Sequence, residues 1–207
     1  MFDFHAHPGT DDKDAFITIL QERELDHISK TSSIGLLPWL EGIEKERIEA
    51  LIKENNLLMV GEFGLDRIRG DVKRDTDAFL FMAELAHDYD RWAVVHSVRC
   101  NQLIIKHFKK LKIKKAIFHS FTGSYEEAKE IERCGYLISL SPRSFRTRDI
   151  GRLLQFDFLL ESDMETGGEQ KKVIENLYQM AYERTGRCVV ERLEMMKRMI
   201  WKDNSCV

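Results

Sequence analysis

The sequence has few of the features that mark secreted or membrane-embedded proteins. No apolar run approaches the roughly 18 residues that a membrane-spanning helix needs, so no membrane partner is expected. The 4 cysteines are widely spaced and form no CxxC pair, which argues against a disulfide framework and a thiolate zinc site. No basic leader followed by an apolar stretch opens the chain. We therefore expect a reducing, cytoplasmic setting.

Prolines are also few, and the net charge is small. Only 3 prolines occur in 207 residues, so no proline-rich linker divides the chain, and we find no repeat or low-complexity segment. The net charge of −3 excludes a uniformly basic coat for nucleic acid, although it leaves room for a local basic rim. Hydrophobic residues make up 43%, which is enough for a sizeable core. We expect one domain over residues 1–207.

Short apolar runs alternate with helical stretches, which predicts βα units around a parallel sheet. Strands are expected near residues 1–5, 15–20, 33–37, 57–61, 92–96, 115–118, 136–140 and 157–161. Only about a dozen residues separate the second strand from the third, so the helix between them should be short or missing. The predicted fold class is α/β: a compact TIM-type (β/α)8 barrel with a shortened second βα unit.

Helices are predicted by apolar residues that recur on one face and by capping signals. The periodic segments are residues 41–55, 75–90, 168–184 and 188–202. Ser124 and Glu127 form a capping-box pattern at the start of another helix, for which Gly135 is a plausible left-handed stop.

Acids and bases fall at the ends of the predicted strands. In a barrel of parallel strands these ends converge on one face, where imidazoles and carboxylates can hold divalent metal. The candidate ligands are His5, His7, Glu62, His96, His119 and Asp163. A lone HxH pair is a weak signal, but six such groups would be costly to bury without a partner. A metal site at this face is therefore our first functional hypothesis.

Other polar residues near these ligands are expected to play lesser parts. Asp3 shares the face of His5 and could support a ligand through a hydrogen bond. Asp66 lies in the loop after its strand, and a role in hydrogen-bonding loop amides is as plausible as a catalytic one. His27, His87 and His107 end no strand, so we expect them to be ordinary surface or packing residues.

Five motifs follow one another from residue 1 to about residue 165: HxH, GEFGLD, VVHS, FHSFTGS and LLESD. Their order resembles the TatD family of metal-dependent hydrolases. The resemblance implies a TIM-type barrel, two divalent metal ions, and a deoxyribonuclease or 3′–5′ exonuclease that cleaves nucleic-acid phosphodiester bonds. It implies that His5, His7, Glu62 and Asp163 hold one ion, and that Glu62 bridges to a second ion held by His96 and His119.

The chemistry of these residues is consistent with that activity. Paired divalent ions can stabilise the attacking and leaving oxygens of a displacement at phosphorus and can acidify water. Asp163 is the best candidate to orient that water and take its proton, with Glu62 as the second catalytic residue. The ligand set admits zinc, manganese or magnesium.

The chain also departs from the family pattern. Leu37 stands where the family usually has the first histidine of a His-Pro-His or His-Pro-Trp string, and Arg99 is displaced by one position from the usual Ser-Arg. One substrate contact is thereby removed. The resemblance therefore supports metal-dependent hydrolysis more strongly than any particular substrate.

Arginines are expected to form the rim of the metal face, because they follow the same strands as the ligands. The candidate substrate-binding residues are Arg67, Arg99, Arg143, Arg146 and Arg148, with Arg69 and Arg74 in the same loops. Trp39 and Phe145 could stack on bases there. The lysine cluster over residues 106–115 precedes the sixth strand and should lie at the opposite end of the barrel.

Two alternatives stay open beside a nuclease acting on DNA or RNA ends. The same metal site could hydrolyse ester or amide bonds, as in a deacylase, because the activated water attacks carbonyl carbon as well as phosphorus. A scaffold that keeps the fold without catalysis is the third hypothesis. The complete ligand set argues against the scaffold, and the arginines favour the nuclease.

Overall fold

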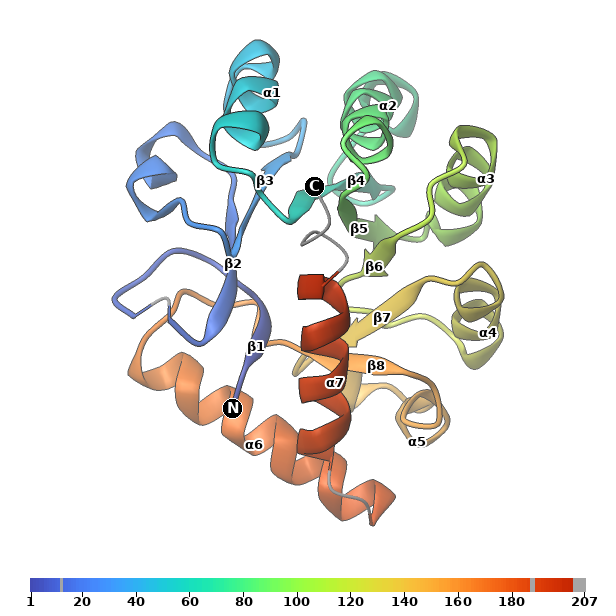
Figure 1. Ribbon diagram of the computed structural model, residues 1–207. Coiled ribbons are helices and arrows are strands. Elements are labelled where there is room, and N and C mark those ends of the chain that lie inside the picture. The colour runs from blue at the N-terminus through green and yellow to red at the C-terminus, as the bar shows by residue number, and fades with distance from the viewer. Residues whose placement is uncertain (12, 187–188, 203–207) are drawn as a thin grey trace.

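The computed structural model describes residues 1–11, 13–186 and 189–202. Eight parallel strands form one sheet that curls into a nearly closed barrel, with helices around its outside (Figure 1). The strands are β1 Asp3–Ala6, β2 Ala15–Ile19, β3 Ser32–Leu36, β4 Met59–Asp66, β5 Trp92–Val98, β6 Ala116–Phe118, β7 Leu137–Leu140 and β8 Phe158–Leu160. They lie in chain order, each paired with the next. The predicted (β/α)8 barrel is confirmed.

Helices or 3-10 turns follow the strands from β2 onward, whereas the described residues between β1 and β2 form no helix. The helices are α1 Lys45–Glu54, α2 Val72–Asp88, α3 Asn101–Leu111, α4 Tyr125–Arg133, α5 Ile150–Leu153, α6 Gly168–Thr185 and α7 Val189–Lys202, with 3-10 turns η1 Glu22–His27 and η2 Ser144–Arg146. Between β2 and β3 the described chain forms only η1, so the second unit is shortened as predicted. The part of the last predicted helix at residue 188 lies outside the described residues.

Two helix starts differ from the predicted ones for identifiable reasons. Helix α2 begins at Val72, before residue 75, because the Asp71 side chain accepts hydrogen bonds from the amides of Lys73 and Arg74. Helix α1 begins at Lys45, because Glu44 keeps an extended backbone. The capping box at the start of α4 is confirmed: Ser124 and Glu127 each accept a hydrogen bond from the other's amide, and Gly135 has a φ of 78° after the helix.

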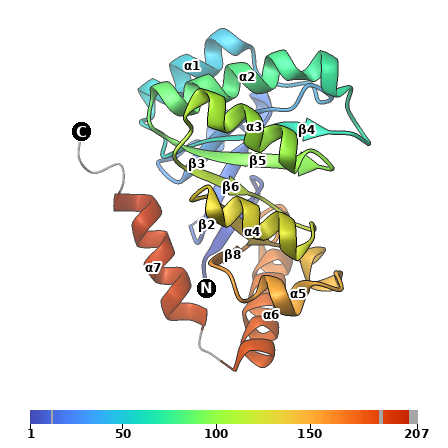
Figure 2. The same ribbon diagram turned by 90° about the vertical axis from the view of Figure 1, so that its right-hand side faces the viewer.

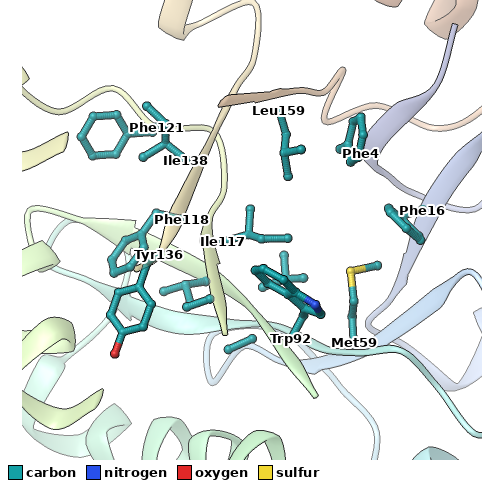
Figure 3. Packing of buried hydrophobic residues seen from close by; sticks show 14 of the residues in the cluster. Phe4, Phe16, Met59, Trp92, Ile117, Phe118, Phe121, Tyr136, Ile138 and Leu159 are labelled. Atoms are coloured by element: carbon teal, nitrogen blue, oxygen red, sulfur yellow. The ribbon is translucent and has the colours of Figure 1, made fainter. Parts of the chain in front are cut away.

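The barrel interior follows the two-residue alternation of the strands. Trp92 and Val94 share their face with His96, and Ile117 shares its face with His119. Met59, Trp92, Ile117 and Leu159 belong to the buried core and lie in the interior in Figure 3. The apolar layer in the barrel thus supports the polar groups that follow it at the carboxyl ends of the strands.

Helix α7 covers the amino-terminal mouth of the barrel, as Figure 2 shows from the side. The Trp201 ring lies 5.3 Å from the Phe16 ring and 6.1 Å from the Phe2 ring, measured between centroids. This mouth is therefore closed by aromatic packing. None of the helices in the described part of the chain is long and apolar enough to cross a membrane.

The seam between β1 and β8 is closed near the carboxyl ends of the strands. The amide of Asp163 donates to the carbonyl of His5 (3.1 Å), and the amide of His7 donates to the carbonyl of Met164 (2.8 Å). Asp3 accepts hydrogen bonds from the amides of His5 (3.2 Å) and Ser162 (3.0 Å). Burial raises the pKa of Asp3 to about 6 although these hydrogen bonds lower it. Asp3 thus supports the candidate ligand His5 by a hydrogen bond, as expected, and does so through the backbone amide.

Candidate metal centre

All six predicted ligands meet at the carboxyl-terminal face of the barrel, opposite α7. They come from β1 or its extension (His5, His7), from β4 and β5 (Glu62, His96), and from the segments directly after β6 and β8 (His119, Asp163). Close backbone approach helps to place them. A Cβ on Gly64 would lie 1.7 Å from the carbonyl oxygen of His96, so only glycine fits beside that strand.

Glu62 lies at the centre of the cluster, with 4% of its surface exposed. Its Oε1 is 2.7 Å from His96 Nδ1 and 2.8 Å from His119 Nε2, and its Oε2 is 3.5 Å from His5 Nε2. Burial raises the pKa of Glu62, but His119, His5 and His96 hold it well below its usual value. Burial lowers the pKa of His119, but the charges of Glu62 and Glu161 hold it well above its usual value.

Asp163 forms a second group with the two histidines of β1. Its Oδ1 lies 3.4 Å from His7 Nε2 and 3.8 Å from His5 Nε2. Burial raises the pKa of Asp163, but the hydrogen bond with His7 and the charges of His119 and His5 lower it to about 2. The carboxylate is therefore ionised at neutral pH and can accept a proton or bind a cation.

The donor atoms fit divalent metal. Two sets each place one ligand atom per residue within 4.8 Å of one another: His5, Glu62 and His119, and His5, His7 and Asp163. His5 belongs to both sets, and its buried Nε2 has no hydrogen-bond partner among the residues that the structure describes. A buried nitrogen that faces two carboxylates without a hydrogen bond is suited to a metal ion.

In three of these histidines, the ring nitrogen that faces away from the donor cluster also contacts a polar side chain. His96 Nε2 lies 3.0 Å from Asp66 Oδ2, His119 Nδ1 lies 3.3 Å from Glu161 Oε1, and His5 Nδ1 lies 3.2 Å from Thr18 Oγ1. Groups placed in this way fix the orientation and tautomer of a ligating imidazole.

Glu161 and Thr18 are functional candidates that the sequence analysis missed. Glu161 is buried and accepts a hydrogen bond from the hydroxyl of Ser139. The hydroxyl of Thr18, which contacts His5, also forms a hydrogen bond of 3.0 Å with Oγ of Ser33. A signal existed for Glu161, because it ends the predicted strand 157–161 as the other ligands end theirs. None existed for Thr18, whose contact with His5 depends on the register between β1 and β2.

A cavity of about 240 Å³ opens beside these groups. Trp39, Leu37, Leu20 and Leu40 line it together with Glu62, His96, His119 and Asp163. The Trp39 ring lies 5.3 Å from the His96 ring, measured between centroids. Trp39 is therefore positioned to stack on a planar group near the donor atoms, as expected.

The arginines divide into two groups. Arg69 and Arg143 line the cavity. Arg67, Arg99, Arg146 and Arg148 are exposed but do not line it, as far as the described residues define it. Arg74 pairs with Asp75 in α2, at 2.9 Å. Of the five candidate substrate residues, the structure thus brings only Arg143 to the donor atoms, and it adds Arg69.

The suggested stacking role of Phe145 is wrong. Phe145 is buried, and the guanidinium of Arg184 lies 5.7 Å from its ring centroid. Its ring is therefore unable to reach a base without unpacking.

The three histidines that were expected to lie outside the site are away from the cluster: His27 lies on η1, His87 on α2 and His107 on α3. The lysines of residues 106–115 lie on α3 and before β6, at the opposite end of the barrel.

Metal binding should release protons. The charges of Glu62 and Glu161 raise the pKa of His119, which favours the protonated imidazole in the metal-free protein, and ligation must remove that proton. At pH 7.5 we expect clearly more proton release per bound ion than the about 0.1 that a histidine of ordinary pKa would give. Apparent affinity should weaken as the pH falls. Calorimetry in buffers of different ionisation enthalpy measures the release.

A matched variant identifies the source of the proton. His107→Gln changes a histidine on α3 and should leave the proton count unchanged, whereas His119→Gln should remove it along with most of the affinity. A wild-type release near zero at pH 7.5 would contradict the assignment of His119.

Comparison with known sequences places the chain among hydrolases. It matches the family described as TatD related DNase over residues 20–202. The uncharacterized metal-dependent hydrolase YjjV of Escherichia coli K12 is 28% identical over 140 residues, which are 62% of this chain and 54% of that protein. An uncharacterized metal-dependent hydrolase of Haemophilus influenzae is 25% identical over 176 residues, 74% of this chain and 65% of that protein. The chain thus aligns with less than two thirds of either relative.

Solved structures show the same fold. The crystal structure of the YjjV TatD homologue from Escherichia coli superposes with a TM-score of 0.76 and 17% identity, covering 99% of this chain and 96% of that chain. A TatD family hydrolase from Entamoeba histolytica has a TM-score of 0.60 and 16% identity over 86% and 79%. Because the family match covers most of the sequence, the chain belongs to the TatD family of metal-dependent hydrolases.

Proposed function

We propose that this hydrolase cleaves phosphodiester bonds at the ends of nucleic acids. The observation that supports the proposal is the placement of Arg69 and Arg143 in the same cavity as the metal donors. Arginine forks match phosphate oxygens, and the ring of Trp39 offers a stacking surface for a base. The cavity thus combines groups that recognise phosphate, base and metal.

We assign the donors to two ions. His5, His7, Glu62 and Asp163 would hold one, and Glu62, His96 and His119 the other. When bound, divalent metal supplies Lewis acidity that acidifies water and neutralises charge on the phosphate. Asp163 orients the attacking water and accepts its proton, because it is the most exposed carboxylate of the cluster and is ionised. Imidazole-rich ligation favours zinc, while the carboxylates also admit manganese or magnesium.

A second candidate is a metal-dependent hydrolase of ester or amide bonds. One feature favours it: Leu20, Leu37 and Leu40 give the cavity an apolar wall, and Leu37 replaces a histidine that the family usually has. An acyl group would pack there. The two arginines and Trp39 weigh toward the nuclease, because a neutral acyl substrate has no use for paired positive charge.

The test is a panel of end-labelled single- and double-stranded DNA and RNA, incubated with Zn²⁺, Mn²⁺ or Mg²⁺ and with chelator. Aminoacyl and acyl esters are included as alternative substrates. Stepwise shortening of oligonucleotides that chelator abolishes supports the proposal. Cleavage of the esters without shortening of any oligonucleotide would move the assignment to a deacylase. The cytoplasm remains the expected location of this activity, and no protein partner is assigned.

The contribution of the two cavity arginines to oligonucleotide binding can be measured separately from cleavage. Replacing Arg69 and Arg143 by Gln should weaken binding of a single-stranded oligonucleotide by about tenfold each, the loss expected of one charge-assisted hydrogen bond. The slope of log affinity against log salt should fall by about 0.7 per lost phosphate contact. Fluorescence anisotropy in chelator measures both quantities without cleavage.

The exposed arginines outside the cavity serve as controls. Arg146→Gln and Arg148→Gln remove the same charge from the same face, and Lys112→Gln removes one from the opposite end. If these variants weaken binding as much as Arg69→Gln, the cavity is not where the phosphate binds.

A further inference from the structure

Asp66 joins two parts of the site that are otherwise separate. It ends β4, and only 2% of its surface is exposed. Its Oδ2 lies 3.0 Å from Nε2 of His96, whose Nδ1 faces Glu62 at 2.7 Å. Its Oδ1 accepts hydrogen bonds from the amides of Ile68 (2.6 Å) and Arg69 (2.9 Å). One carboxylate therefore holds a candidate metal ligand and the loop that carries a cavity arginine.

Two backbone hydrogen bonds also hold the loop from Arg67 to Gly70. The amide of Arg67 donates to the carbonyl of Val98 at 3.2 Å, and the amide of Gly70 donates to the carbonyl of Asp66 at 3.1 Å, which closes a tight turn. Arg67 and Arg69 are exposed, and Ile68 has 66% of its surface exposed. Asp66 is thus the buried side chain that attaches the amides of Ile68 and Arg69 to the barrel.

The turn also lies against Trp39. A Cβ built on Gly70 would come within 3.1 Å of the Trp39 ring and 2.3 Å of Asp75 Oδ2, so a larger residue would displace the loop. Because Trp39 in turn packs against His96, the imidazole, the indole and the loop form one continuous contact. The hydrogen bonds of Asp66 and the contact with Trp39 therefore help to set the position of Arg69 relative to the metal donors.

The two oxygens of Asp66 serve the two contacts separately, because Oδ2 faces the imidazole and Oδ1 accepts from the loop amides. If His96 held a metal through Nδ1, it would carry its proton on Nε2 and donate it to Asp66.

We propose that Asp66 is a positioning residue that couples the metal ligand His96 to the substrate-binding loop Arg67–Gly70. One oxygen fixes the tautomer and orientation of His96, and the other fixes Arg69 in the cavity. The substrate half of this inference rests on the proposed function, whereas the metal half does not. The alternative is that Asp66 only satisfies nearby backbone amides, as Asp71 does at the start of α2 by accepting from the amides of Lys73 and Arg74.

Two substitutions separate the two oxygens. Asp66→Asn retains an acceptor for the loop amides but places an amide donor against His96, so Zn²⁺ affinity measured by calorimetry should fall by about 10- to 100-fold. Binding of a single-stranded oligonucleotide to the chelated protein should stay within about threefold of the wild type. Asp66→Ala loses both contacts and should weaken both affinities. Asp71→Asn is the matched control and should change neither.

A double-mutant cycle tests the loop contact directly. Arg69→Gln should weaken oligonucleotide binding about tenfold in the wild type but less than about twofold in the Asp66→Ala background, because Arg69 is already misplaced there. Arg143→Gln should cost the same in both backgrounds. An equal cost of Arg69→Gln in both would overturn the substrate half of the proposal.

The outcomes distinguish this inference from the proposed function. If the wild type binds and cleaves no nucleic acid, the nuclease fails, and the Zn²⁺ measurements on Asp66→Asn still decide the metal half. If Asp66→Asn lowers the melting temperature but binds Zn²⁺ as tightly as the wild type, Asp66 only satisfies nearby backbone amides and the inference is overturned.

Discussion

Replacing Asp163 by asparagine should lower kcat by about 10²- to 10⁴-fold, the range expected when a general base is removed. The amide cannot accept the proton of the attacking water. Asp163 also faces His7 and His5, at 3.4 Å and 3.8 Å, so metal affinity should fall as well. The fold should be kept, since the backbone amide of residue 163 still donates to the carbonyl of His5. Steady-state kinetics at saturating metal, with bound metal measured in the same samples, checks this.

Glu165→Gln is the matched control for Asp163→Asn. Glu165 lies two residues further along, pairs with His7 through the backbone only, and is exposed. Its substitution should leave kcat within about twofold. Full turnover in a completely metallated Asp163→Asn protein would remove Asp163 from the chemistry and leave it as a ligand only.

The metal ligands were predictable because they depend on a rule that the sequence carries. Residues at the ends of parallel strands meet on one face, and His5 and His7 point the same way because alternate strand residues do. Helix α2 shows where the pattern was weaker. Its apolar periodicity located the helix, but its start was set by the side chain of Asp71, which the periodicity does not reveal.

The substrate-binding residues were harder to predict, because they lie in loops. Strand order placed the arginines on the correct face, but which of them lines the cavity depends on loop geometry. Arg69 is directed by the hydrogen bonds that Asp66 makes to the loop amides, and Arg67, two residues earlier, does not line the cavity. The prediction that Phe145 stacks on a base was wrong for a related reason, because the 3-10 turn η2 after β7 places its ring in the core.

Residues behind the ligands depend on contacts between strands that are far apart in the sequence. Thr18 reaches His5 from β2, and Glu161 reaches His119 from the end of β8. Thr18 has no sequence pattern that marks it, and Glu161 is marked only by its place at the end of the predicted strand 157–161. Only the register of the barrel brings them to the imidazoles, and that register is a property of the whole sheet.

Replacing Glu62 by glutamine should abolish both metal binding and turnover. Glu62 is within 3.5 Å of a nitrogen on each of His5, His96 and His119, and in the proposed two-ion assignment it is the ligand that both ions share. The amide keeps the shape but removes the charge that attracts the cations, and its nitrogen would face imidazole nitrogens. We expect a loss of at least about 100-fold in metal affinity, beyond the effect of removing a supporting contact.

Thermal unfolding gives the clearest readout of that loss. Metal at about 100 times its Kd should stabilise the wild type by about 2.7 kcal/mol, which raises the melting temperature of a domain of this size by roughly 5–10 °C. In Glu62→Gln the same metal concentration should raise it by less than about 2 °C. Asp75→Asn is the control: Asp75 is also a buried carboxylate, but its partners are Arg74 and the amide of Asp71. That variant should be less stable and still show the full metal-induced shift. A full shift in Glu62→Gln would mean that the ions bind elsewhere, and both the ligand assignment and the proposed two-ion centre would then be wrong.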